Sequence, residues 1–140
     1  KKAVSIARPV NAKVSFITLA TDPELYNQFA APMMENLREV IDKYLREHYR
    51  EDISLEQLAD FLHFNPSYTS DLFKRIFGKP FVSYLTSMRV ETAKVLLERG
   101  KFKTYEIAEH VGYQDEKYFF KTFKKVTGFT PKEYRKRHLK

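Results

Sequence analysis

The 140-residue sequence has no cysteine, no apolar run of membrane-spanning length and, after residue 31, no segment that alternates like a β-strand. The absence of cysteine excludes a disulfide framework, a zinc–thiolate site and a thiol nucleophile, and it suits a reducing cytoplasm. No run approaches the roughly 18 apolar residues of a membrane helix, and the pattern of a secretory signal peptide is missing. Because the first residue is Lys1, we expect a fragment or a processed form of a longer protein.

Apolar residues make up 43% of the sequence and charged residues 31%, which is typical of a globular chain rather than a disordered one. The formal net charge is +7, and most of the excess lies in residues 101–140, where eleven Lys/Arg and five Asp/Glu give a net of +6. Such an end attracts nucleic acid, an anionic membrane surface or an acidic protein. On composition alone, a solubilising tail is an equal alternative.

Local signals predict an all-α fold of about seven helices. The first helix is indicated by apolar residues at helical spacing up to about His48, namely Met34, Leu37, Val40, Ile41 and Leu45. Later helices are predicted at residues that favour helix starts, namely Ser54, Asn65, Pro80, Thr104, Asp115 and Thr130, with ends at Gly78, Gly100 and Gly128. Residues 1–31 have too few apolar residues to fold alone, and we interpret them as a linker or the tail of a preceding domain.

An internal repeat of about 50 residues divides the rest of the chain. Leu58-Ala59 returns as Ile107-Ala108, and the segment 73–78 (FKRIFG) returns as 123–128 (FKKVTG). Each copy reads as a short helix, a tight turn and a second helix that ends at glycine, which is the outline of a helix-turn-helix. The predicted organisation is a first unit at about 54–78, a linker helix at about 80–99, a second unit at about 104–128 and a last helix at about 131–138.

The second helix of each copy can be divided into an inner and an outer face. In the first copy the inner face holds Thr69, Leu72, Phe73 and Ile76, and the outer face holds Ser67, Ser70, Asp71 and Lys74. In the second copy the inner face holds Phe119, Thr122, Phe123 and Val126, and the outer face holds Lys117, Phe120, Lys121 and Lys124. We expect Tyr118 in the core and Phe120 outside among the lysines, where its ring suits a thymine methyl in a major groove. The alternative is that Phe120 packs on the connecting helix or on another part of the protein.

From about Met34 to Arg137 the sequence resembles the DNA-binding domain of the AraC/XylS family of transcription regulators. The second half matches through Ile107-Ala108, Val111-Gly112-Tyr113, Asp115, Tyr118-Phe119, Phe123-Lys124-Lys125, Gly128, Thr130-Pro131 and Tyr134-Arg135. The first half matches through Ser54-Leu55, Leu58-Ala59, Asn65-Pro66-Ser67-Tyr68, Leu72-Phe73-Lys74 and Gly78, and the linker through Tyr84-Leu85, Arg89, Ala93 and Leu96-Leu97. The resemblance assigns residues 32–140 to this domain.

The resemblance implies sequence-specific binding of double-stranded DNA, with two recognition helices in successive major-groove segments, for transcription activation in the bacterial cytoplasm, at the nucleoid. It also implies RNA polymerase as a partner and a separate effector or receiver domain, whose tail residues 1–31 would be. The implied base-reading residues are Ser67, Ser70, Asp71, Glu116, Lys117, Phe120 and Lys121. The implied phosphate contacts are Ser54, Lys74, Thr104, Lys124 and Thr130, three of them at helix starts, which attract anions.

Two positions depart from the family pattern. Asp71 is acidic where the family is usually polar or basic, and Phe120 is aromatic where the family is commonly small or polar. A carboxylate repels phosphates but can accept a hydrogen bond from a cytosine amino group. We therefore expect the second unit to supply much of the electrostatic attraction to DNA.

Other classes of function find little support in the sequence. The four histidines, at 48, 63, 110 and 138, are too scattered for a metal site, no catalytic constellation is present, and we expect neither enzyme activity nor a cofactor. His63 fits a turn or a cap, and Arg89, which lies in the linker helix, fits a structural ion pair or a carbonyl contact. The alternatives to specific DNA binding are a basic helical module that docks on an acidic protein and a non-specific DNA binder.

Overall fold

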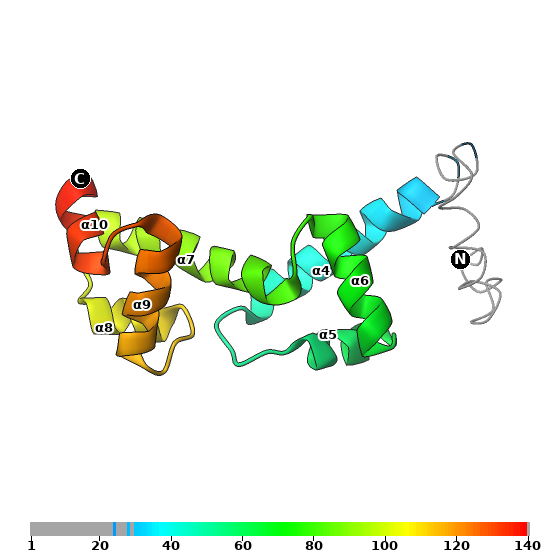
Figure 1. Cartoon of the computed structure of the whole chain (residues 1–140), viewed down its shortest axis with the longest axis horizontal. Coiled ribbons are helices and arrows are strands. Elements are labelled where there is room, and N and C mark those ends of the chain that lie inside the picture. The colour runs from blue at the N-terminus through cyan, green and yellow to red at the C-terminus, as the bar shows by residue number, and fades with distance from the viewer. Residues whose placement is uncertain (1–23, 25–27, 29, 140) are drawn as a thin grey trace. The chain divides into compact units, whose positions relative to one another are not determined.

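The computed structural model describes Glu24, Gln28 and residues 30–139. Within this part of the chain it contains seven α-helices and no strand, which confirms the predicted all-α fold (Figure 1). The helices are α4 (Ala31–His48), α5 (Leu55–Leu62), α6 (Pro66–Phe77), α7 (Phe81–Arg99), α8 (Thr104–His110), α9 (Glu116–Thr127) and α10 (Pro131–His138). The interpretation of residues 1–31 as a linker or a tail falls almost wholly outside the described residues.

The described part of the chain divides into two units inside α4, between residues 42 and 43. Both helix-turn-helix units, the first with α5–α6 and the second with α8–α9, lie within residues 43–140. Among the described helices, none combines the length and the apolar composition that crossing a membrane requires.

Side-chain caps explain why most helices begin where they do. Ser54 and Thr130 each form a capping box, in which the hydroxyl oxygen accepts from the N–H of Gln57 or Glu133, and that residue's side chain accepts from the cap's own N–H. Asn65 and Asp115 accept from backbone N–H groups at the starts of α6 and α9. These four predicted starts are confirmed.

The predicted cap at Thr104 is wrong by one residue. Thr104 is the first residue of α8 and Lys103 is the extended residue before it, whose N–H donates to Glu106 Oε1 at 2.8 Å. Glu106 therefore satisfies a donor at this helix start, and the Thr104 hydroxyl donates to Glu116 Oε2 at 3.3 Å. This hydrogen bond ties the start of α8 to the start of α9.

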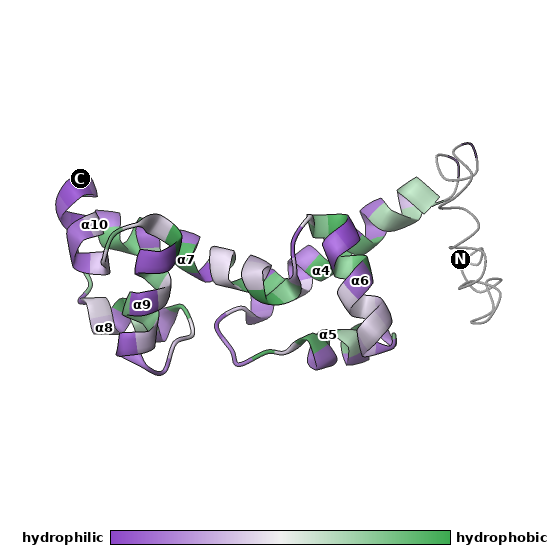
Figure 2. Ribbon diagram, in the orientation of Figure 1, coloured by the Kyte–Doolittle hydropathy of each residue, from purple (hydrophilic) through white to green (hydrophobic). Residues whose placement is uncertain are grey.

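The linker helix α7 holds the two helix-turn-helix pairs. It contacts α6 in the first unit and α8, α9 and α10 in the second (Figure 1). Near its start, Phe81 and Tyr84 contact the ring of Phe73 edge-on, with centroids 5.5 and 5.6 Å apart. Further along, α7 contributes Val90, Ala93 and Leu97 to the buried core of the second unit. Figure 2 shows apolar segments along α7 and a hydrophilic α10.

Tyr134 anchors α10 to α7 through its hydroxyl group. Its side chain is 8% exposed, and Oη donates to Glu98 Oε2 at 2.7 Å. Burial and then the Glu98 carboxylate raise the pKa of Tyr134 to about 12, because both disfavour the phenolate. With an ordinary pKa of 10.0, the protonated hydroxyl stabilises the fold fully below pH 10, and this contribution is lost as the pH rises through about 12.

Tyr134→Phe is expected to lower the free energy of unfolding at pH 7 by about 1.5–3 kcal/mol, the usual range for a hydrogen bond to a charged group. The variant should also lose less stability than the parent between pH 10 and pH 12. Urea melts followed by circular dichroism at pH 7, 10 and 12 measure both effects. The control is Tyr105→Phe, at an exposed tyrosine of α8. Identical pH profiles for the parent and Tyr134→Phe would contradict this assignment.

Candidate nucleic-acid interface

The recognition helix of the second unit, α9, has a sharply divided surface. Phe119 and Phe123 are fully buried, with 0% exposure. The opposite side carries four exposed lysines, Lys117, Lys121, Lys124 and Lys125. The predicted division into an apolar inner face and a cationic outer face is therefore confirmed for Phe119 and Phe123 and for Lys117, Lys121 and Lys124. Lys125 adds a further positive charge to this surface.

The placement of the other aromatic side chains of α9 differs from the prediction. Phe120 is half-buried and packs against the edge of the core with Leu96 and Phe129, its ring centroid 6.1 Å from that of Phe119. Tyr118, expected in the core, is 59% exposed. At about 100° per residue, Phe120 and Val126 lie about 60° from Phe123 on opposite sides, and Tyr118 lies about 140° from it. The buried face is therefore centred on the Phe120 side of Phe123, which leaves residues 118 and 126 outside.

Val126 was also expected on the inner face, but its side chain is 48% exposed. It lines an open groove of about 620 Å³ between α9 and α7, together with Tyr118, Lys121 and Val82. Residue 127 takes the inner position at this end, where the Thr127 hydroxyl donates to the carbonyl oxygen of Phe123 at 2.8 Å.

The recognition helix of the first unit, α6, is polar rather than cationic. Its inner residues Thr69, Leu72 and Phe73 are buried as predicted, and Ile76 is half-buried. The outer face exposes Ser67, Asp71 and Lys74, while Ser70 is half-buried. Thus α6 and α9 present different chemistry to a ligand.

The helix starts that were predicted to contact phosphates are not equivalent. The Ser54 and Thr130 hydroxyls are used in caps, and near Thr130 the carboxylate of Glu133 remains ionised, because the hydrogen bond from the Thr130 backbone holds the pKa of Glu133 below its usual value. Thr104 bonds to Glu116, which is itself half-buried. Each of the three helices also has a carboxylate in its first turn, namely Glu56 in α5, Glu106 in α8 and Glu133 in α10.

Three arginines act as donors to backbone carbonyl groups far away in sequence. Arg89 donates to Tyr49 and Glu51, as expected for a structural residue of the linker helix. Arg50 donates to His110, and Arg135 donates to Leu97 and Phe102. No local pattern in the sequence predicts the contact of Arg50. Arg135, in contrast, belongs to the Tyr134-Arg135 motif that matched the family. In the turns, His63 has a left-handed backbone with φ of 61°, which confirms its predicted role.

Sequence analysis did not single out the basic surface of α10. Lys132, Lys136 and Arg137 are exposed, and the Arg137 guanidinium carbon lies 4.7 Å from the centroid of the Phe129 ring. The only signal for it was the +6 balance of residues 101–140. Together α9 and α10 carry most of the cationic surface of the second unit.

The family model described as a helix-turn-helix domain matches residues 58–137, which is more than half of the chain. The chain belongs to the AraC/XylS family of transcription regulators. The matched residues form an AraC-type DNA-binding domain, and the family consists of transcription regulators rather than enzymes.

Solved AraC-type domains have the same fold. The C-terminal domain of the two-component response regulator yesN from Fusobacterium nucleatum is 42% identical, with a TM-score of 0.70 over 71% of this chain and 98% of that chain. The DNA-binding domain of AdpA, a global transcriptional factor solved in complex with a target DNA, is 26% identical, with a TM-score of 0.66 over 71% of this chain and 88% of that one.

Curated relatives fall into two groups. The uncharacterized HTH-type transcriptional regulator YtdP from Bacillus subtilis is 31% identical over an alignment of 126 positions, which covers 82% of this chain but only 16% of that protein. Universal stress protein C from Salmonella typhi is 85% identical over just 40 residues, 29% of this chain and 30% of that protein. The AraC-type chain thus spans less than a third of either relative, and the second similarity is too short to assign a family.

Proposed function

We propose that this AraC-type domain binds double-stranded DNA at a specific sequence, with α6 and α9 in successive major-groove segments. The observation that carries the proposal is the pair of helix-turn-helix units on one helix, each with a polar outer face on its second helix. On α9 this face has exposed lysines, and on α6 it has the exposed Ser67 and Asp71. Cationic groups hold the phosphate backbone, and polar side chains on a helix read base edges.

The two units have different parts in this proposal. Lys117 and Lys121 read bases from α9 together with Glu116, and Lys124 holds a phosphate. On α6, Ser67, Ser70 and Asp71 read bases with little electrostatic attraction, and Lys74 meets a phosphate. Phe120 contributes the accessible part of a half-buried ring, so it can contact a thymine methyl only at the edge of the interface. The helix starts at Ser54, Thr104 and Thr130 contact phosphates through their backbone N–H groups.

Selection from random duplex DNA with this chain tests the proposal. We expect an enriched site with two half-elements about ten base pairs apart, one helical turn of DNA. Binding without any enrichment would favour a non-specific DNA binder, and failure to bind duplex DNA would favour a module that docks on an acidic protein.

We further propose that the domain activates transcription through RNA polymerase, in the bacterial cytoplasm at the nucleoid. It would do so as part of a longer protein with a separate effector or receiver domain.

The bound duplex is expected to bend modestly. The 19 residues of α7 span about 28 Å at about 1.5 Å per residue, whereas successive major-groove faces lie about 34 Å apart. A rigid pair of helices set closer than this distance seats both helices only if the DNA curves towards them. Circular-permutation gels with the selected site measure the bend. Straight DNA with both half-elements protected from cleavage would contradict the expectation.

A further inference from the structure

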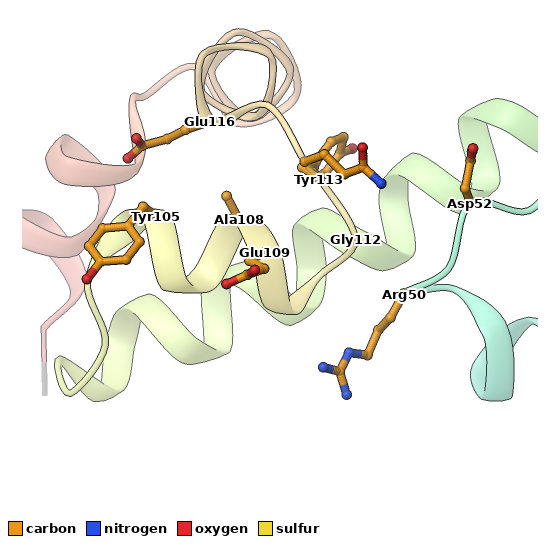
Figure 3. Close-up of a pocket in the computed structure, with 9 residues that line it drawn as sticks. Arg50, Asp52, Tyr105, Ala108, Glu109, Gly112, Tyr113 and Glu116 are labelled. Atoms are coloured by element: carbon orange, nitrogen blue, oxygen red, sulfur yellow. The ribbon is translucent and has the colours of Figure 1, made fainter.

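The segment between α4 and α5 touches the second helix-turn-helix unit although it leads into the first. Arg50 Nε donates to the carbonyl oxygen of His110, the last residue of α8, at 2.6 Å. Figure 3 shows Arg50 extending from this segment towards the end of α8, close to Gly112. An arginine that enters one unit thus satisfies a carbonyl group at the helix end of the other.

The backbones of the two units also meet directly at Gly112. This glycine has φ of +101°, and a Cβ placed on it would lie 2.9 Å from the carbonyl oxygen of Arg50. Real Cβ atoms do not approach a backbone oxygen so closely, so only glycine permits the contact as well as the backbone conformation. The turn of the second unit is therefore pressed against the entry to the first.

Arg89 of the linker helix completes the junction. Its Nε donates to the carbonyl oxygen of Tyr49 and its Nη2 to that of Glu51, both at 2.8 Å, and its guanidinium carbon lies 5.2 Å from the centroid of the Tyr113 ring. The planar fork of an arginine can serve two carbonyl groups and an aromatic face at once, which a lysine cannot. We define the junction as Tyr49–Glu51, Arg89 and His110–Tyr113.

We propose that this junction fixes the rotation of the second helix-turn-helix unit relative to the first. It thereby determines which spacing of DNA half-elements the chain accepts. The inference rests on the proposed function. Without the junction, the two units would be coupled through α7 alone, and long helices bend. A shift of one base pair moves a half-element by about 3.4 Å and turns it by about 35° around the duplex axis. Two rigidly coupled helix-turn-helix units lose affinity for the shifted duplex, whereas two loosely coupled units can adjust to it.

The test compares Arg50→Met, which keeps the aliphatic stem and loses the Nε donor, with the parent. The control is Arg99→Met, at another exposed arginine. Affinity is measured for the selected site and for duplexes whose half-elements are one base pair closer or further apart. We expect the parent and the control to lose about tenfold on the shifted duplexes, the usual scale of one mismatched contact. Arg50→Met should lose less than about threefold. An unchanged penalty in a folded Arg50→Met would overturn the inference.

A second measurement needs no DNA and separates this inference from the proposed function. The sequence has no cysteine, so Lys74→Cys and Lys124→Cys introduce the only thiols for spin labels on α6 and α9. Pulsed electron paramagnetic resonance should give a narrow distance distribution in the parent and in Arg99→Met, and a broader one in Arg50→Met. Equal widths would overturn the junction even if the chain binds DNA specifically. Broadening in a chain without sequence preference would uphold the fixed rotation while the proposed function fails.

Discussion

Phe123→Ala is expected to lower the free energy of unfolding by about 3–5 kcal/mol, the usual cost of removing a buried phenylalanine side chain. The Phe123 ring is fully buried, with its centroid 5.8 Å from that of Phe119 and 5.5 Å from that of Tyr134, which it meets edge-on. Its loss opens a cavity where α9 and α10 meet. Because the free energy of unfolding of a small domain is only about 5–15 kcal/mol, this substitution removes a large part of it. Urea melts followed by circular dichroism measure the change.

The matched control for this prediction lies on the same helix. Val126 was predicted to share the inner face with Phe123, but it is 48% exposed, and Val126→Ala should cost less than about 1 kcal/mol, as surface changes do. Comparable losses for the two substitutions would mean that residue 126 is part of the core, as the sequence pattern indicated. A small loss for Phe123→Ala would contradict the buried position of its ring.

Local chemistry explains why so much of the fold could be predicted. The capping boxes at Ser54 and Thr130 and the cap at Asp115 form between residues two or three apart, so the sequence contains both partners side by side. The repeat then identified two similar helix pairs. The error at Thr104 is only one residue, because Lys103 takes the N-cap position and Glu106, three residues on, accepts from its N–H.

The orientation of α9 could not be predicted from its own residues. Helical spacing identifies a stripe of apolar side chains, but the centre of the buried face depends on what packs against it. Here Val90 and Leu97 of α7 and Tyr134 of α10 form one core with Phe119 and Phe123. That packing draws Phe120 to the edge of the core and leaves Tyr118 outside.

The partners of the arginines were beyond prediction for a different reason, although a carbonyl contact was expected for Arg89. Arg50 and His110 are 60 residues apart, and Arg89 and Tyr49 are 40 apart. Their acceptors are backbone carbonyl groups, which every residue has, so no residue type marks the partner. For the candidate interface, sequence reasoning gave the right side of α9 for its lysines, and the base-reading and phosphate roles of individual residues stay predictions.

Lys121→Ala is expected to weaken binding to the selected duplex about 5- to 150-fold, since a lost contact between a basic side chain and a base edge costs roughly 1–3 kcal/mol. Lys121 is exposed within one turn of Lys117 and Lys124 on α9, whereas the acidic Glu116 is half-buried on another side of the helix and bonds to Thr104. Its charge therefore adds to a local positive potential. Titrations by fluorescence anisotropy at several salt concentrations measure the affinity and its salt dependence.

Lys74→Ala on α6 is the matched comparison, and its effect should be smaller. Lys74 shares its exposed face with Asp71, whose carboxylate repels the phosphates that Lys74 attracts. The slope of log K against log salt changes by about 0.9 for each phosphate neutralised, and we expect a larger change for Lys121→Ala, whose charge lies among the lysines of α9, than for Lys74→Ala, whose charge Asp71 offsets. Equal losses of affinity and slope for the two substitutions would show that both units hold the DNA equally. In that case the two units would attract DNA equally, and α6 would differ from α9 only in the bases that Ser67 and Asp71 read.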